Sequence, residues 1–165
     1  MQDLIELFRH NAWANARVFD LVLELDRSLV EGAAPGTRDT VRGTLAHLVR
    51  VEDAYFAMTE RRDRQSLGSP DAYMAQELEA FSIRIREVGA AYVELLEKRS
   101  AEALDFELDI PWFKFPVSAR EGLRQVLTHS AQHRSQVLSW LSAKGTPTPD
   151  LDYVLMLQEE RPVNP

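Results

Sequence analysis

The chain has 165 residues, a length that suits a single domain over 1–165 with a sizeable hydrophobic core. Its net charge of −7 argues against a surface for nucleic acids or anionic membranes, because both need a basic patch. The absence of cysteine excludes disulfides, cysteine-based zinc sites and a cysteine nucleophile. The first residues lack the pattern of a signal peptide, and no stretch is apolar enough to cross a membrane. We therefore expect a cytoplasmic protein.

Apolar residues recur at helical spacing in several long stretches. We expect a first helix over 3–25, with Asp3 as its cap, and a second over 40–61. A loop rich in Gly, Pro, Thr and Asp separates these two helices. The dipeptide Ser69-Pro70 is typical of a helix start and predicts a third long helix over 70–99.

The pattern changes over 105–117, where apolar and polar residues alternate as in a strand. This alternation indicates either a short β-hairpin or an extended crossover. Ser118 and Glu121 have the spacing of a capping box, which opens a fourth long helix that ends just before Gly145. Asp150 is a candidate cap for a short last helix. The expected fold is all-α, with four long helices forming a bundle.

The chain has four histidines: His10, His47, His129 and His133. His129 and His133 are four residues apart on the fourth helix, so their imidazoles share one face and can converge on one ion. This spacing alone also fits two histidines at the surface or at the rim of the core. Both residues lie on the apolar stripe of their helix, however, and His47 lies on the inner face of the second helix. Because a buried imidazole needs a partner, three inward histidines favour a shared metal ion.

Three histidine ligands leave at least one coordination position open, as catalytic zinc sites do and structural ones do not. An ion there would lower the pKa of bound water, or would bind and polarise an incoming anionic group. Imidazole suits Zn, Ni, Cu and Fe alike, and we expect Zn²⁺ first and Ni²⁺ next. No Glu follows His129 directly, so the general base of zincins is missing there. Glu52 is rotated well away from the direction of His47.

Three segments resemble the DinB/YfiT-like family of metal-dependent enzymes. HNAWANARVF resembles the first-helix signature of the family, GTLAHLVRVEDAYF its second-helix motif, and HSAQHRSQVLSWLSAKGTPTPDLDYV its final motif. The resemblance covers nearly the whole chain. It implies a four-helix bundle with a long crossover connection, usually a homodimer, with a metal on His47, His129 and His133. The family usually has glycine where this chain has Ser135, which concerns the packing around the last histidine and not the ligands.

The resemblance also suggests a reaction. Some branches of the family resemble transferases or isomerases that use a low-molecular-weight thiol such as bacillithiol, mycothiol or glutathione. The leading hypothesis is therefore a metal-dependent thiol S-transferase or isomerase that acts on a small electrophile, because a metal holds a coordinated thiol as the thiolate. Two alternatives are metal-dependent hydrolysis and a non-catalytic, metal-binding module that serves in stress response or as a structural dimer.

Several other residues have both a functional and a structural interpretation. His10 either has a role as a fourth ligand or in substrate binding, or is a histidine at the rim of the core or at the surface. Asn11 is a candidate to fix a histidine tautomer from outside the ligand set. Arg134 and Gln136 either support the site or bind an anion, or they form pairs with Glu or Asp on the helix surface. Three aromatic residues before the fourth long helix either wall a substrate pocket or form a dimer contact: Trp112, Phe113 and Phe115.

Overall fold

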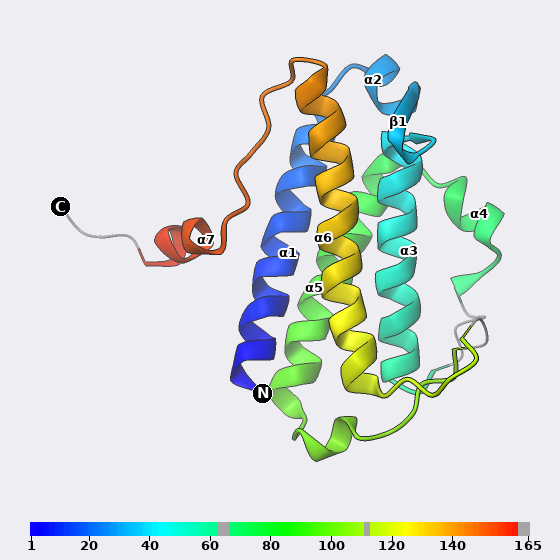
Figure 1. Ribbon diagram of the computed structural model, residues 1–165, viewed down its shortest axis with the longest axis vertical. Helices are drawn as coiled ribbons and strands as arrows, with labels where there is room; N and C mark the ends of the chain where they lie inside the picture. Colours follow the sequence, from blue (N-terminus) through cyan, green and yellow to red (C-terminus); the bar gives the residue numbers. More distant parts are fainter. Residues whose placement is uncertain (63–66, 111–112, 162–165) are drawn as a thin grey trace.

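The computed structural model describes residues 1–62, 67–110 and 113–161. Four long helices lie side by side (Figure 1): α1 (Gln2–Leu23), α3 (Val41–Thr59), α5 (Leu78–Lys98) and α6 (Ala119–Ala143). Both α1 and α3 pack against α5 and α6. The colours of Figure 1 show that α1 and α6 run in one direction along the bundle, while α3 and α5 run in the other. The prediction of an all-α four-helix bundle is confirmed.

A crossover connects α3 to α5. Since these two helices are parallel, the chain must return along the outside of the bundle, and the short helix α4 (Pro70–Met74) lies on this path (Figure 1). Ser69 caps α4 by accepting a hydrogen bond from the backbone N–H of Ala72 at 3.2 Å, as expected. The single helix predicted over 70–99 is wrong, because α4 ends before α5 begins.

The break between α4 and α5 has a specific cause. Arg42 of α3 donates to the backbone carbonyl of Met74 at 2.9 Å and also to the carbonyl of Gln76. A continuous helix would need these carbonyls for its own backbone hydrogen bonds. The arginine satisfies them from outside, so the helix can end at Met74 and a new one can begin at Leu78.

The predicted loop between the first two long helices contains two short elements, α2 (Arg27–Glu31) and β1 (Ala33–Arg38). The expected cap Asp3 is wrong, because α1 already begins at Gln2 and Asp3 lies within its first turn. A 3₁₀ turn, η2 (Glu102–Leu104), follows α5. Beyond it, Glu107 and Ser118 form one antiparallel bridge, which fits the predicted hairpin. Pro111 and Trp112 lie outside the described residues.

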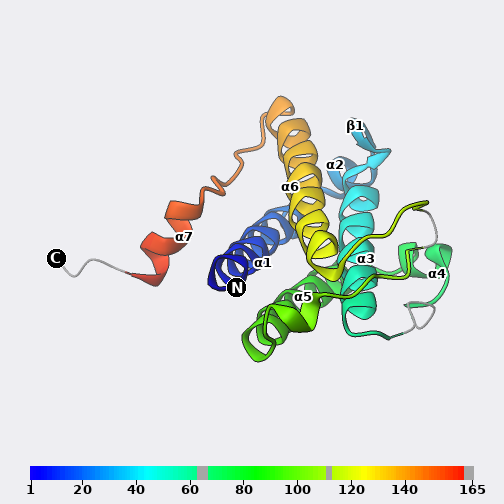
Figure 2. The ribbon, with the colours of Figure 1, turned by 60° about the horizontal axis from the view of Figure 1, so that its bottom comes forward.

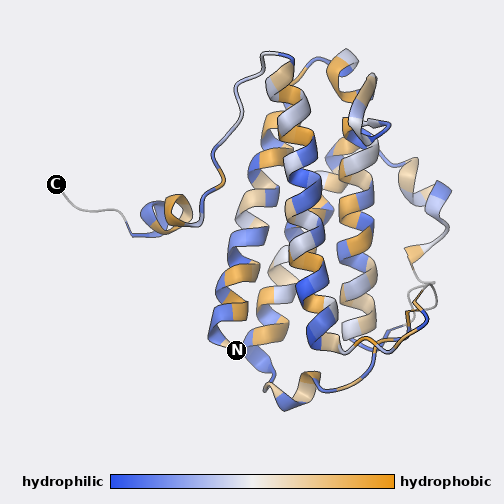
Figure 3. Ribbon diagram, in the orientation of Figure 1, coloured by the Kyte–Doolittle hydropathy of each residue, from blue (hydrophilic) through white to orange (hydrophobic). Residues whose placement is uncertain are grey.

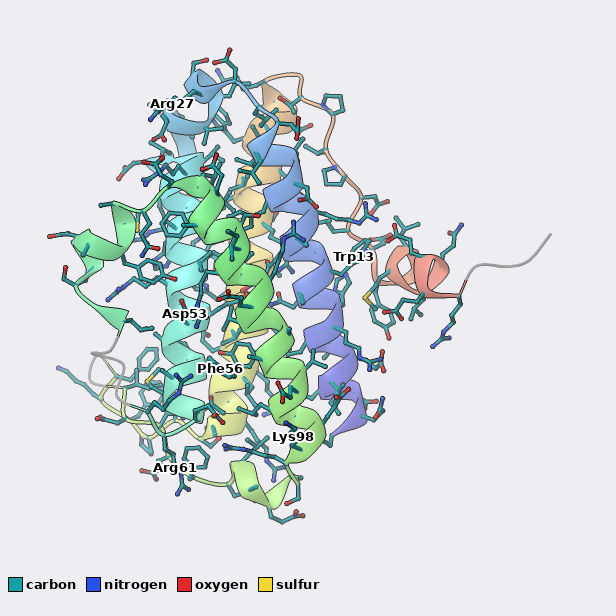
Figure 4. The ribbon with its side chains drawn as sticks, turned by 180° about the vertical axis from the view of Figure 1, so that it is seen from behind. Trp13, Arg27, Asp53, Phe56, Arg61 and Lys98 are labelled. Carbon is teal, nitrogen blue, oxygen red and sulfur yellow. The ribbon has the colours of Figure 1, made fainter. Side chains whose placement is uncertain are left out.

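The two ends of α6 match the sequence pattern. Ser118 and Glu121 form a full capping box, and Gly145 after the helix has a φ of 83°. The last helix, α7 (Tyr153–Glu160), has Asp152 as its N-cap residue, while Asp150 instead accepts a hydrogen bond from the N–H of Asp152. Figures 1 and 2 show α7 apart from the bundle, at the end of an extended connection. Trp13 points from α1 toward this helix (Figure 4) and donates from Nε1 to Glu159 at 2.9 Å.

The core lies between the four long helices. Each helix carries both apolar and polar residues along its length (Figure 3), and the apolar ones turn inward. The largest fully buried aromatic side chains come from α1 and α5: Phe8, Phe19, Phe81 and Tyr92. Within the described parts of the chain, no helix combines the length and the apolar character that crossing a membrane requires.

Candidate metal centre

The three histidines singled out by the sequence lie together between α3 and α6. Nε2 of His129 is 3.1 Å from Nε2 of His47 and 3.1 Å from Nε2 of His133. One nitrogen from each ring can be chosen so that all three lie within 4.8 Å of one another. The i, i+4 spacing on α6 sets the pair His129 and His133, and the packing of α3 against α6 adds His47.

Hydrogen bonds between the three imidazole rings cannot pair all of the ring nitrogens that face one another. Nδ1 of His133 is 2.7 Å from Oε1 of Gln136, so this nitrogen carries the proton and Nε2 presents a lone pair to the cluster. Nε2 of His129 then has two nitrogen neighbours, although a neutral ring nitrogen offers either one proton or one lone pair. A divalent cation instead accepts a lone pair from each of the three rings.

The rings are neutral at ordinary pH. Burial, followed by the positive charge of Arg38, lowers the pKa of His47 to about 4. Burial, followed by the two neighbouring histidines, lowers the pKa of His129 to about 3. Burial also lowers the pKa of His133, against the opposing effect of its bond to Gln136. All three lone pairs are therefore available to a metal without the removal of a proton.

The distances agree with a metal site. Zinc–imidazole bonds of about 2.0–2.1 Å at a tetrahedral angle put two ligand nitrogens about 3.3 Å apart, close to the 3.1 Å that separates His129 from each of the other two histidines. Gln136 holds the outer nitrogen of His133, as partners outside the ligand set do in known metal sites. This contact is the one expected if Gln136 supports the site. The outer nitrogen Nδ1 of His129 is buried and has no hydrogen-bond partner.

A buried polar network lies beside the cluster. Glu52 of α3 is fully buried, and its Oε1 accepts hydrogen bonds from Asn11 at 2.9 Å, Asn15 at 2.8 Å and Ser130 at 2.6 Å. Arg134 donates to Oδ1 of both asparagines, at 2.6 and 2.7 Å. Burial raises the pKa of Glu52, while these hydrogen bonds and the charge of Arg134 lower it. The network joins α1, α3 and α6 at the level of the histidines.

This network corrects two expectations, for Asn11 and for Arg134, and adds two residues that the sequence did not indicate. The role predicted for Asn11 as a histidine partner is wrong, because its side chain binds Glu52 and Arg134. Arg134 is only 6% exposed, so the alternative of a surface pair is also wrong. Asn15 and Glu52 were not predicted to take part. The one signal available was the pair Asn11 and Asn15, four residues apart on the first helix and close to its inward face.

His10 lies away from the cluster. Its Nε2 is 2.7 Å from the backbone carbonyl of Leu151, on the connection to α7, and its ring contacts Trp13 and Tyr153. The interpretation of His10 as a histidine at the rim is confirmed.

A cavity of about 550 Å³ opens beside the histidines, and His47 and His129 form part of its wall. Phe113 lines this cavity, in agreement with the predicted pocket wall, whereas Phe115 is 65% exposed. The other lining residues are mostly apolar: Arg50, Val51, Ala54, Tyr55, Leu67, Gly68, Pro70 and Gln125. The arrangement combines nitrogen ligands for a metal with room for a small molecule next to them.

Comparisons with known proteins agree with this architecture. The model of the DinB family matches residues 1–162. The structure of YfiT from Bacillus subtilis, described as a probable metal-dependent hydrolase with an unusual four-helix bundle topology, is similar with a TM-score of 0.72. The match has 12% sequence identity and covers 89% of this chain and 90% of that one, so it establishes the fold alone. None of the curated protein sequences matches this chain. The family match over nearly the full length shows that the chain belongs to the DinB family.

Proposed function

We propose that this protein is a metal-dependent enzyme that transfers a low-molecular-weight thiol to a small electrophile. The metal, Zn²⁺ or Ni²⁺, would be held by His47, His129 and His133. The observation that carries the proposal is the convergence of three neutral imidazoles, two of which, His47 and His129, form part of the wall of a cavity of about 550 Å³. Cavities of this size accept small molecules.

Each group of residues would have a different role in the reaction. The three histidines donate lone pairs, and Gln136 keeps the proton of His133 on the outer nitrogen. A divalent ion at this place would supply Lewis acidity, which keeps a coordinated thiol deprotonated at neutral pH. Val51, Ala54 and Phe113 provide an apolar wall that excludes water from the electrophile. In the transfer, a sulfur–carbon bond forms, the thiol proton passes to solvent, and the leaving group departs with its bonding electrons.

The lining of the cavity favours thiol transfer over hydrolysis. Hydrolysis of an amide or an ester is helped by a side chain that shuttles a proton between water and the leaving group. Among the described residues that line the cavity there is no Asp or Glu. Glu52 is fully buried and does not line the cavity, and its Oε1 accepts three hydrogen bonds within its own network. A thiolate attack needs no such group.

Metal-dependent hydrolysis is the second candidate. The likeness in fold to YfiT, described as a probable metal-dependent hydrolase, favours it. One experiment compares both reactions. Protein purified without a His-tag is loaded with Zn²⁺ or Ni²⁺ and tested with bacillithiol, mycothiol and glutathione against 1-chloro-2,4-dinitrobenzene, and with 4-nitrophenyl esters in the absence of thiol.

We expect thiol-dependent turnover that His129→Ala abolishes. Ester cleavage without thiol would replace the transferase proposal by the hydrolase. Full metal occupancy with no turnover in either assay would favour the non-catalytic alternative of a metal-binding or structural module. We also propose that the protein is a homodimer, and sedimentation equilibrium would measure its mass in solution.

A further inference from the structure

Arg50 is a charged residue in the cavity that the proposed chemistry does not use. It lies on α3, one turn after His47, and lines the cavity together with His47 and His129. Its terminal nitrogen NH1 is buried and has no hydrogen-bond partner. Buried guanidinium N–H groups are normally paired, because leaving one unpaired is costly. Arg50 therefore brings a positive charge to the wall of the cavity, and one of its N–H donor groups has no partner in the protein.

The two acidic residues that follow Arg50 on α3 have other partners. Glu52 belongs to the buried network described above. Asp53, one turn beyond Arg50, lies on α3 where this helix faces α5 (Figure 4). Arg84 of α5 binds both of its carboxylate oxygens, with its shortest contact at 2.6 Å, and the hydroxyl of Tyr73 donates to Oδ2 at 2.6 Å. Arg50 instead stacks over the ring of Tyr73, with 5.4 Å between its guanidinium carbon and the ring centre. This contact orients the arginine, and no carboxylate among the described residues forms an ion pair with it.

Two positive charges lie near His47. The guanidiniums of Arg38 and Arg50 both act on His47, where each lowers the pKa of the ring by repelling its protonated form. Three neutral imidazoles bring no negative charge, and a divalent metal would add two positive charges. Among the described residues that line the cavity, no carboxylate balances them. In a chain with a net charge of −7, this pocket is a local exception that attracts anions.

We infer that the cavity binds a small organic anion, whose carboxylate or sulfonate pairs with Arg50 while its apolar body lies against Val51, Ala54 and Phe113. A guanidinium fits this role because its planar donors match the geometry of such anions. The assignment of the anion as the substrate rests on the proposed function. The binding itself depends on neither metal nor turnover, so the two proposals can fail independently.

The test measures the preference for charge in a matched pair of ligands. Calorimetric titration at about pH 7.5 compares 2-naphthalenesulfonate with the neutral methyl 2-naphthyl sulfone. It uses the metal-loaded protein and the same protein treated with EDTA. Sulfonates are weak metal ligands, and the low pKa values of His47 and His129 keep these rings uncharged at this pH. The variants are Arg50→Gln and Arg50→Lys, and the control is Arg86→Gln, which removes an exposed charge that pairs with Asp20.

We expect the protein to bind the sulfonate about 10- to 100-fold more tightly than the sulfone, the range of one charged hydrogen bond. Arg50→Gln should remove this preference and leave the affinity for the sulfone within about 2-fold, which shows that the pocket is still folded. Arg50→Lys should keep part of the preference, and Arg86→Gln should keep all of it. Three results would overturn the inference: no binding of the sulfonate, equal binding of both ligands, or a full preference in Arg50→Gln. Loss of the preference in Arg38→Gln with retention in Arg50→Gln would move the anion site to Arg38.

Discussion

Lowering the pH should destabilise the metal-free protein through its histidine cluster. The pKa of His47 is about 4 and that of His129 about 3, both below the value of 6.5 for an unperturbed histidine. Below about pH 6.5 the unfolded chain binds protons at these positions and the folded chain does not. The free energy of unfolding is therefore highest above this pH, and it decreases as the pH falls toward the folded-state values.

The size of the effect follows from the width of this window. Between pH 6.5 and about pH 5, each ring contributes 1.5 pH units at about 1.4 kcal/mol per unit, or about 2 kcal/mol. His47 and His129 are only partly buried, so water screens the charged form, and we halve the contribution to about 1 kcal/mol for each ring. Together the two histidines should remove about 2 kcal/mol of stability over this interval.

Urea unfolding in EDTA at about pH 7.5, 6.5 and 5 measures this loss. His47→Gln should lose about 1 kcal/mol less than the wild type between pH 6.5 and 5, and the control His10→Gln leaves the cluster intact. The raised pKa of Glu52 acts in the opposite direction, but it is present in both proteins and cancels in the difference. Equal losses in the wild type and in His47→Gln would refute the reasoning.

Three further outcomes are expected. His129→Ala should abolish the metal content of tag-free protein in elemental analysis while His10→Ala retains it, and equal contents would contradict the ligand assignment. Arg134→Met should lower the free energy of unfolding, measured in urea, by about 3 kcal/mol, because Glu52 stays buried without its nearby cation. A loss below about 1 kcal/mol would mean that the buried carboxylate does not need this cation. Gly122→Ala should lower the free energy of unfolding by about 1–3 kcal/mol, since the new Cβ would lie 2.4 Å from a methyl carbon of Leu108. An unchanged Tm in calorimetry would show that Leu108 moves aside.

The arrangement of the histidines could be predicted because its determinants are local. His129 and His133 share a helix face by their spacing alone, and the apolar pattern of each long helix shows which face is buried. The ends of α6 were equally predictable, since the capping box at its start and Gly145 after its end each act through residues that are close in the sequence. That three such residues form a working metal site is a prediction that metal analysis has still to test.

The features that the sequence did not reveal depend on contacts between distant segments. The break after Met74 exists because Arg42, 32 residues earlier, binds a carbonyl there. Glu52 resembles any acidic residue on a solvated helix face, and its burial becomes favourable only once Asn11 and Asn15 are packed against it. Neither partner is close to Glu52 in the sequence. Predicting such a network requires the helix packing first.

The three histidines come from two different helices, and the stability of the folded chain would therefore depend on the metal concentration. His47 and His129 are 82 residues apart in the chain, so the complete ligand set exists only after α3 and α6 have packed together. An ion that binds this set would bind the native state and not the unfolded one. By mass action, a free metal concentration 1,000 times the Kd would add about 4 kcal/mol to the free energy of unfolding. The lifetime of the folded chain against heat and proteases would then follow the concentration of metal around it.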